Sequence, residues 1–174
     1  MFTIELIGAQ RVISFIDGLI SRISDLSPAF SRIHEDFIET EMKLFASEGR
    51  SGEHGKWSDW TDDYANWREE NFPGAPENIM ILEGGLLDSL TGGDGHVSRI
   101  GAQEAQFGTD LQTPSGYGLG AVHFEGFTAK YPYGHTSVPS KGVPARKVID
   151  ATEEDMNRWT TMVAEHIFGS AKVL

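Results

Sequence analysis

The chain has 174 residues, which suits one domain and disfavours two full ones. It contains no cysteine, which excludes disulfide scaffolds, Cys-ligated metal sites and cysteine nucleophiles. Its 26 acidic and 14 basic residues give a net charge of −12, which opposes non-specific nucleic-acid binding because such binding needs Lys and Arg to neutralise phosphates.

We expect one domain, 1–174, with a helical front at 9–72, a strand-rich section at 79–149 and a C-terminal helix at 153–168. The division follows the distribution of glycine, because 13 of the 20 glycines lie between Gly84 and Gly142. No run of 18 apolar residues and no leader pattern occurs, so we expect a soluble, intracellular protein without membrane association.

Two amphipathic helices are expected at the front. Between Ala9 and Leu26 apolar residues recur every three or four positions, which is the helical period. The pair Ser27-Pro28 ends this helix and starts the next, with Ser27 as its N-cap. The second apolar pattern continues to Gly49.

The glycine-rich stretch 49–56 is predicted to be a mobile loop, since it holds no apolar anchor. Behind it, Trp57, Trp60, Tyr64 and Trp67 have helical spacing and predict an aromatic stripe on one helix face. Such a stripe suits burial against the core, and an interface anchor is the functional alternative.

Four segments are predicted as strands of an antiparallel sheet: Phe2–Ile7, His96–Gly108, Tyr117–Phe127 and Val143–Ile149. Packed by the front helices and the C-terminal helix, they give an α+β fold. The long segment between the last two strands, 128–142, has no periodicity, and connections of that length are usually functional or disordered.

The C-terminal helix has a clear start signal. Thr152-Glu153-Glu154-Asp155 resembles a capping box, with Asp in place of the usual Glu. The positions Met156, Trp159, Met162/Val163 and Ile167 then predict a buried face, and Gly169 ends the helix.

Catalytic and metal chemistry find little support. The six histidines include no His-x-x-x-His pair. His123 and Glu125 would share one face of the predicted strand, which allows a small hydrolase as an alternative function. A structural histidine is favoured, because a metal site needs at least three protein ligands. We therefore expect no catalytic residue, no metal and no cofactor.

Three short motifs follow one another in this chain. The first is Gly-x-Leu-x-x-Ser-Leu, the second runs from Gly-Thr to Tyr and His-x-x-Gly, and the third is Val-Pro-Ala-Arg. They fall on Gly84, Leu86, Ser89, Leu90, Gly108, Thr109, Tyr117, His123, Gly126, Val143, Pro144, Ala145 and Arg146. In this order they resemble motifs of the phage virion morphogenesis or tail completion proteins of Mu-like and P2-like long-tailed phages. Glu83 stands where the family has Thr, and Gly118 where it has Ala.

The resemblance implies a structural protein without enzymatic activity, which completes the tail or neck and prepares it for head–tail joining. It implies a homo-oligomeric ring, a hexamer or a dodecamer, at the head-proximal end of the tail in the virion. Its partners would be tail tube or terminator proteins and head–tail connector proteins, with DNA passing through unbound. A head-side connector or a capsid-associated protein is the alternative.

Two loops are the expected contacts with neighbours, 49–56 and 128–142, because both are polar and lack buried anchors. The candidate interface residues are Lys130, Tyr131, Tyr133, His135 and Arg146. For Arg146 we expect an ion pair with a carboxylate of its own or a neighbouring subunit, since a lone charge in a β-prone stretch seldom stays buried unpaired.

Overall fold

The computed structural model describes residues 8–113, 116–126 and 144–169, and confirms an α+β fold. Its described part contains a two-stranded antiparallel sheet and six helices. The strands are β1 (His96–Ile100) and β2 (Ala105–Thr109). The helices are α1 (Ala9–Ser24), α2 (Ser27–Ala46), α3 (Asp62–Asn71), α4 (Gly85–Thr91), α5 (Leu119–Glu125) and α6 (Glu153–Phe168).

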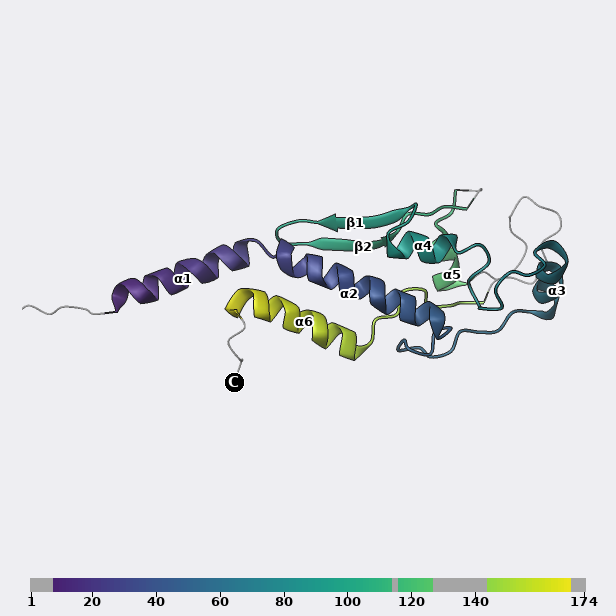
Figure 1. The fold of residues 1–174 in the computed structure, drawn as a ribbon, viewed down its shortest axis with the longest axis horizontal. Helices are drawn as coiled ribbons and strands as arrows, with labels where there is room; N and C mark the ends of the chain where they lie inside the picture. Colours follow the sequence, from purple (N-terminus) through teal and green to yellow (C-terminus); the bar gives the residue numbers. More distant parts are fainter. Residues whose placement is uncertain (1–7, 114–115, 127–143, 170–174) are drawn as a thin grey trace, which may run out of the picture.

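Helix α2 lies in the middle of the molecule (Figure 1). It packs against α6 on one side, and against α4 and the β1–β2 hairpin on the other. Helix α1 projects from one end of this body, and α3 lies at the opposite end. The chain is therefore elongated along the direction of α2.

The two front helices form as separate rods, in agreement with the periodicity of their apolar residues. Ser27 is the first residue of α2, and the preceding residue Leu26 occupies the N-cap. Asp25 supplies the polar contact instead, because its Oδ1 accepts hydrogen bonds from the Ser27 backbone N–H at 3.0 Å and from the Ser27 hydroxyl at 2.6 Å. The prediction that Ser27 is the N-cap was wrong by one residue, although Pro28 does lie in the first turn.

The sheet is smaller than the sequence pattern predicted. The segment His96–Gly108 is a hairpin of two strands, with His96 opposite Thr109 and Ile100 opposite Ala105. Its turn is closed by the Gly101 backbone N–H, which donates to the Glu104 carbonyl at 2.8 Å. The expected first strand, 2–7, lies outside the described residues.

Two other predicted strands are contradicted. Most of Tyr117–Phe127 is the short helix α5, whose ends are closed by backbone hydrogen bonds from Val122 to Gly118 and from Gly126 to Val122. Of Val143–Ile149, residues 144–149 run without strand pairing. That segment is held by buried Arg146 and Val148, so side-chain contacts replace a hydrogen-bonded ladder.

The hydrophobic core forms around the inner face of α2. Phe37, Leu44 and Phe45 of this helix are almost fully buried. They pack together with residues from four other segments, namely Trp57, Ile79, Leu86, Leu90 and Val148. The core thus joins α2 to distant parts of the chain, including the segment before α6.

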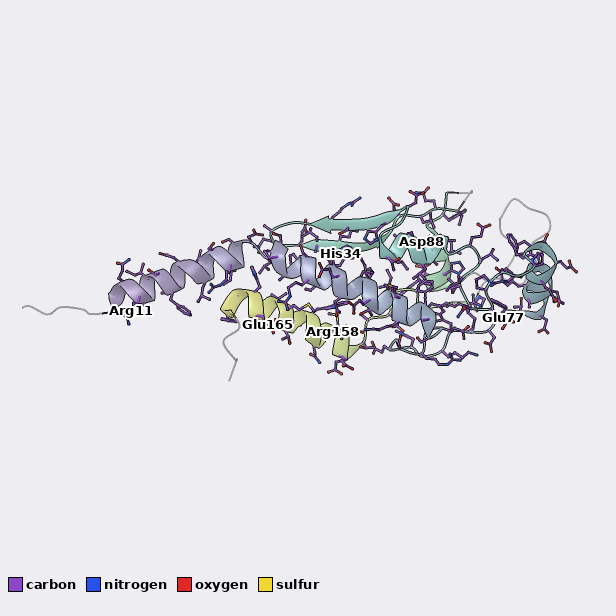
Figure 2. All side chains as sticks on the ribbon, viewed as in Figure 1. Arg11, His34, Glu77, Asp88, Arg158 and Glu165 are labelled. Carbon is purple, nitrogen blue, oxygen red and sulfur yellow. The ribbon has the colours of Figure 1, made fainter. Side chains whose placement is uncertain are left out.

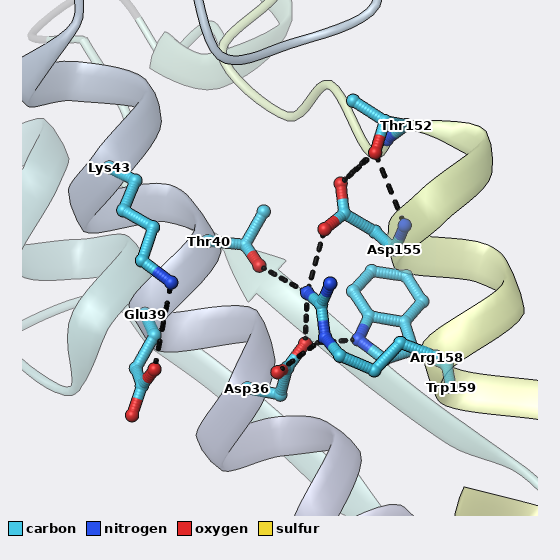
Figure 3. A network of polar contacts seen from close by, with 8 residues as sticks. All are labelled: Asp36, Glu39, Thr40, Lys43, Thr152, Asp155, Arg158 and Trp159. Atoms are coloured by element: carbon cyan, nitrogen blue, oxygen red, sulfur yellow. Dashed lines mark hydrogen bonds and ion pairs between the residues drawn. The ribbon is translucent and has the colours of Figure 1, made fainter. Parts of the chain in front are cut away.

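Helix α6 is fixed to α2 by a polar clamp (Figure 3). Arg158 donates two hydrogen bonds to the Asp36 carboxylate, at 2.8 and 2.7 Å, and a third to Asp155 at 2.7 Å. The Trp159 indole also donates to Asp36, at 2.6 Å. The predicted capping box is confirmed, since Thr152 and Asp155 exchange hydrogen bonds at the start of α6.

Exposure differs sharply between the helices. No residue of α1 is buried, whereas α2 buries six. Figure 2 shows Arg11 near the free end of α1 and Glu77 at the far end of the molecule. None of the helices in the described ranges has the length and apolar character that crossing a bilayer requires.

We predict that Arg158→Ala destabilises the fold by about 2–3 kcal/mol at pH 7, because it leaves two poorly exposed carboxylates unpaired. The hydrogen bond from Arg158 lowers the pKa of Asp36, so the clamp stabilises the fold above the usual aspartate pKa and weakens as the pH falls through the lowered value. Urea unfolding at pH 7 and at acidic pH measures both effects.

The matched control is Lys43→Ala. Lys43 pairs with Glu39 at 3.8 Å on the solvent side of α2, where both side chains are about 70% exposed. Its loss should change the free energy of unfolding by less than about 0.5 kcal/mol. Equal destabilisation by the two substitutions would contradict the role of the clamp.

Candidate functional site

The first motif segment forms helix α4 and its junction with the core. Gly84 precedes the helix at a positive φ of 85°, a conformation that favours glycine. Leu86 and Leu90 enter the hydrophobic core. Ser89 is fully buried, and its hydroxyl donates to the Leu86 carbonyl at 2.8 Å.

The second motif meets the first through a pair of hydroxyl groups. The Thr109 hydroxyl, at the end of β2, donates to the Ser89 hydroxyl at 2.8 Å. Thr109 also accepts from the Leu111 backbone N–H at 3.0 Å, so its oxygen is used on both sides. Beside it in β2, Gly108 is buried. These contacts hold the hairpin against α4.

A pair of histidines connects Ser89 of this polar contact to helix α2. The His96 Nδ1 lies 3.1 Å from the Ser89 carbonyl, and its Nε2 lies 2.8 Å from Nε2 of His34. Burial, and then the nearby His96, lower the pKa of His34, which favours the neutral form of His34. The described residues contain no group of three His, Asp or Glu placed to hold a metal ion.

The remaining part of the second motif lies in and around α5. The Tyr117 backbone exchanges hydrogen bonds with Thr113, and the Tyr117 side chain is half exposed. Gly126 follows α5 at a positive φ of 74°. Val122 in the same helix is buried, so α5 is anchored to the body through its middle.

His123 and Glu125 do not form the pair that the strand prediction placed on one face. In a helix, two residues that are two positions apart are rotated by about 200° around the helix axis, so their side chains lie on nearly opposite sides. Glu125 is exposed, whereas His123 Nδ1 is buried and has no hydrogen-bond partner among the described residues. Burial, with a smaller effect of Arg146, lowers the pKa of His123 to about 4, so the ring is neutral near pH 7.

Arg146 of the third motif joins three separate segments. Its backbone N–H donates to the His123 carbonyl at 2.7 Å. Its buried guanidinium donates to the carbonyls of Ser58 at 3.0 Å and Asp59 at 3.3 Å. Within the described chain, carbonyl oxygens therefore take the place of a carboxylate from its own subunit, and an ion pair with a neighbouring subunit remains a prediction.

The other residues of this motif are less involved. Pro144 is half-buried and Ala145 is exposed. Val143 lies outside the described residues, as do the candidate interface residues Lys130, Tyr131, Tyr133 and His135 and the whole of loop 128–142. The contacts that we expect from them remain predictions.

The aromatic stripe is only partly helical, because α3 begins at Asp62. Trp57 lies in the core, where its ring meets Phe45 edge-on at 5.0 Å and its Nε1 donates to the Lys147 carbonyl at 2.9 Å. Trp60 precedes the helix and contacts Tyr64. The expectation of one continuous helix face was therefore wrong, although burial of the stripe is confirmed for Trp57.

Arg68 of α3 connects several segments around this helix, a role that the sequence pattern did not indicate. It is buried, lies 4.2 Å from the centre of the Trp60 ring, and donates to the Ile81 carbonyl at 2.7 Å and to the Pro76 carbonyl. Its position within a charged run, Trp67-Arg68-Glu69-Glu70, gave no signal for burial.

The glycine-rich loop 49–56 is packed against the segment before α6. The Asp150 carboxylate accepts from the His54 backbone N–H at 2.9 Å, and its other oxygen lies 2.6 Å from His54 Nδ1. A Cβ at Gly52 would overlap the Asp150 side chain. The interpretation that this loop lacks anchors was wrong, because the anchors are a backbone approach and a distant carboxylate.

Glu41 is an acidic residue that is almost fully buried. It lies on the inner side of α2, is 1% exposed, and its Oε2 has no hydrogen-bond partner in the described part of the chain. Burial, with the nearby carboxylates of Asp150 and Asp155, raises the pKa of Glu41 to about 8. A neutral carboxylic acid is therefore the dominant form near pH 7.

A scan against protein-family models, a search of curated proteins and a search of solved structures each find no match for this chain.

We predict that Glu41→Gln removes a pH-dependent loss of stability. The folded state holds the Glu41 proton up to about pH 8, whereas the unfolded state releases it near the usual value of 4.5. The free energy of unfolding should therefore fall between these pH values, and the substitution should raise it at pH 8 by about 2–4 kcal/mol.

Urea unfolding at pH 5 and pH 8 tests this effect. Glu39→Gln is the matched control, because Glu39 lies two residues away on the exposed side of α2. The control should keep the wild-type pH dependence. A Glu41→Gln protein whose stability falls with pH as the wild type does would contradict the buried neutral acid.

We also predict that Arg146→Ala lowers the free energy of unfolding by about 2–4 kcal/mol, because it leaves two carbonyls without their donor and removes a buried side chain. Arg146→Lys should retain only part of this stability, since an ammonium lacks the planar fork that reaches both carbonyls. Tryptophan fluorescence during urea unfolding measures the loss. The exposed Arg99 of β1 provides the control, and an Arg99→Ala loss as large as that of Arg146→Ala would disprove the prediction.

Proposed function

We propose that this chain is a structural protein of a long-tailed phage, which completes the tail or neck as a homo-oligomeric ring. The observation that carries the proposal is the use of the motif residues. Segments far apart in sequence meet through them, at Ser89 and Thr109 and again at His123 and Arg146. A chain whose motif residues hold its framework together is what we expect of a structural building block.

The electrostatics of the chain support the same role. A net charge of −12 disfavours attraction between the protein and DNA phosphates. A ring that DNA passes through works best when its wall does not bind the phosphates, because binding would slow the passage. An acidic chain is therefore compatible with a place around the DNA path in the neck.

The hydrolase alternative has weaker support. It needs His123 and Glu125 to act together, and α5 separates these side chains. His123 is half-buried and its pKa is lowered, and its buried Nδ1 has no hydrogen-bond partner among the described residues. The head-side connector alternative differs from our proposal only in where the ring lies, so it is an outcome of the test.

The test uses the phage that encodes this chain. We expect a nonsense mutation in its gene to yield DNA-filled heads and full-length tails that do not join, as counted by electron microscopy of the lysate. A plasmid expressing the wild-type chain should restore joined, infectious particles. The same plasmid with a stop codon in the reading frame is the control.

Two results would change this assignment. Joined and infectious particles without the protein would refute a role in tail completion. Complete tails together with heads that have lost their DNA would favour the head-side alternative.

A further inference from the structure

Helix α1 projects from the body, and its direction is set at its C-terminal end. Three groups near the junction with α2 are bound by other elements. Arg22 Nε donates to the Ile167 carbonyl at 2.6 Å, Gln103 Nε2 donates to the Ile23 carbonyl at 2.7 Å, and the Leu26 N–H donates to the Ala102 carbonyl at 2.8 Å. The helix is thus held at its root by α6 and by the hairpin turn (Figure 1).

Beyond this root, α1 has an apolar face that nothing in the described structure covers. At about 100° per residue, all its apolar side chains fall on one arc of about 160°, and its polar side chains and Gly18 fall on the other. Six large apolar residues of this arc are between 47 and 59% exposed. They are Val12, Ile13, Phe15, Ile16, Ile20 and Ile23.

The exposed face is large for a monomer. Six side chains that are half exposed present about 600 Å² of apolar surface, which is the upper end for the largest patch on a typical monomeric protein. Two such faces packed together would bury about 1,200 Å², the lower bound of a standard stable interface. The face therefore has the area that a specific protein contact requires.

We propose that the apolar face of α1 is an oligomerisation surface, which packs against α1 of a second copy of this chain. Charge favours this occupant. Arg11, Asp17 and Arg22 give α1 a net charge of +1, so all other residues together carry −13. Two acidic copies repel each other least where their α1 helices meet, at the end of the molecule away from α3.

The spacing within the face fits packing of helix on helix. Val12, Ile16, Leu19 and Ile23 follow one another at intervals of four, three and four residues, which is the heptad spacing of a coiled-coil seam. Phe15, Ile13 and Ile20 widen the face beyond a two-stranded seam. A face of this width can contact two neighbouring helices at once, as copies in a closed ring require.

A membrane surface fits less well. Amphipathic helices that bind anionic lipid have polar faces rich in Lys and Arg. The polar face of α1 carries only two arginines, beside Asp17 and three serines. The polar face of α1 therefore lacks the positive charge that anionic lipid would require, and a second copy of the chain is the better occupant of the apolar face.

This inference names the surface through which copies of the proposed ring meet, and so rests on the proposed function for its place in the particle. The self-association itself is measured on the purified full chain. Failure of one therefore does not imply failure of the other. Self-association of a protein that virions do not need would refute the function alone, and a tail protein that assembles without its α1 face would refute the inference alone.

Sedimentation equilibrium of matched variants tests the surface. Ile16→Glu/Ile20→Glu places two charges on the apolar arc, whereas Ser14→Glu/Ser21→Glu places the same two charges on the opposite side of the same helix. We expect the wild type and the serine variant to self-associate in the micromolar range. The isoleucine variant should associate at least about 100-fold more weakly, because association would bury its new charges.

Folding is monitored separately. No residue of α1 is buried in the body, so thermal unfolding of the body at a dilution where the wild type is monomeric should be the same for all three proteins. A wild type that stays monomeric to about 100 μM, or an isoleucine variant that assembles as the wild type does, would overturn the proposal. So would binding of the wild type to anionic vesicles in place of self-association.

Cysteine cross-linking locates the contact directly. The chain has no cysteine, so single substitutions give an unambiguous signal. Ile16→Cys should yield covalent dimers with a short bismaleimide, and Ser14→Cys on the opposite face should yield far fewer. Equal yields from the two positions would contradict contact through the apolar arc.

Discussion

The structure depends on the burial of α2 from two sides. One side of this helix places Phe37, Leu44 and Phe45 in the core, and the other places Asp36 under Arg158 of α6. Apolar burial supplies the larger stabilisation, while the charged contact fixes the position and orientation of α6. Because segments from both halves of the chain pack on this one helix, α2 positions α4, α6 and the β1–β2 hairpin relative to one another.

Polar contacts over long sequence separations complete the framework that the small sheet does not provide. Arg146 and Arg68 bind backbone carbonyls, and Asp150 binds the glycine-rich loop. Each of these groups satisfies irregular backbone that would otherwise be buried without partners. The body therefore consists of helices joined by loops whose conformations are fixed by single charged side chains. Such a body leaves α1 free to make contacts outside its own chain.

The helices could be predicted from the sequence because their signals are local. The apolar period of α1 and α2 and the capping box at Thr152 each lie within a few residues. Helix α5 could not be predicted, since its glycine-rich sequence has no clear period, and the segment was predicted as a strand. Arg146 bound to Ser58 and Asp59, or Gly52 against Asp150, depends on segments about 90 residues apart. No local pattern encodes such contacts. The sequence therefore identified the motif residues, but it did not predict which of them contact each other.

We propose that this chain is a building block of a phage particle and that its projecting helix docks on its own copies, and a high-resolution image of that particle tests this proposal most directly. The account predicts a closed ring of copies at the head–tail joint, in which the face formed by Ile16 and Ile20 is covered by neighbouring copies. A particle without this chain, or a ring in which α1 faces open solvent, would contradict it.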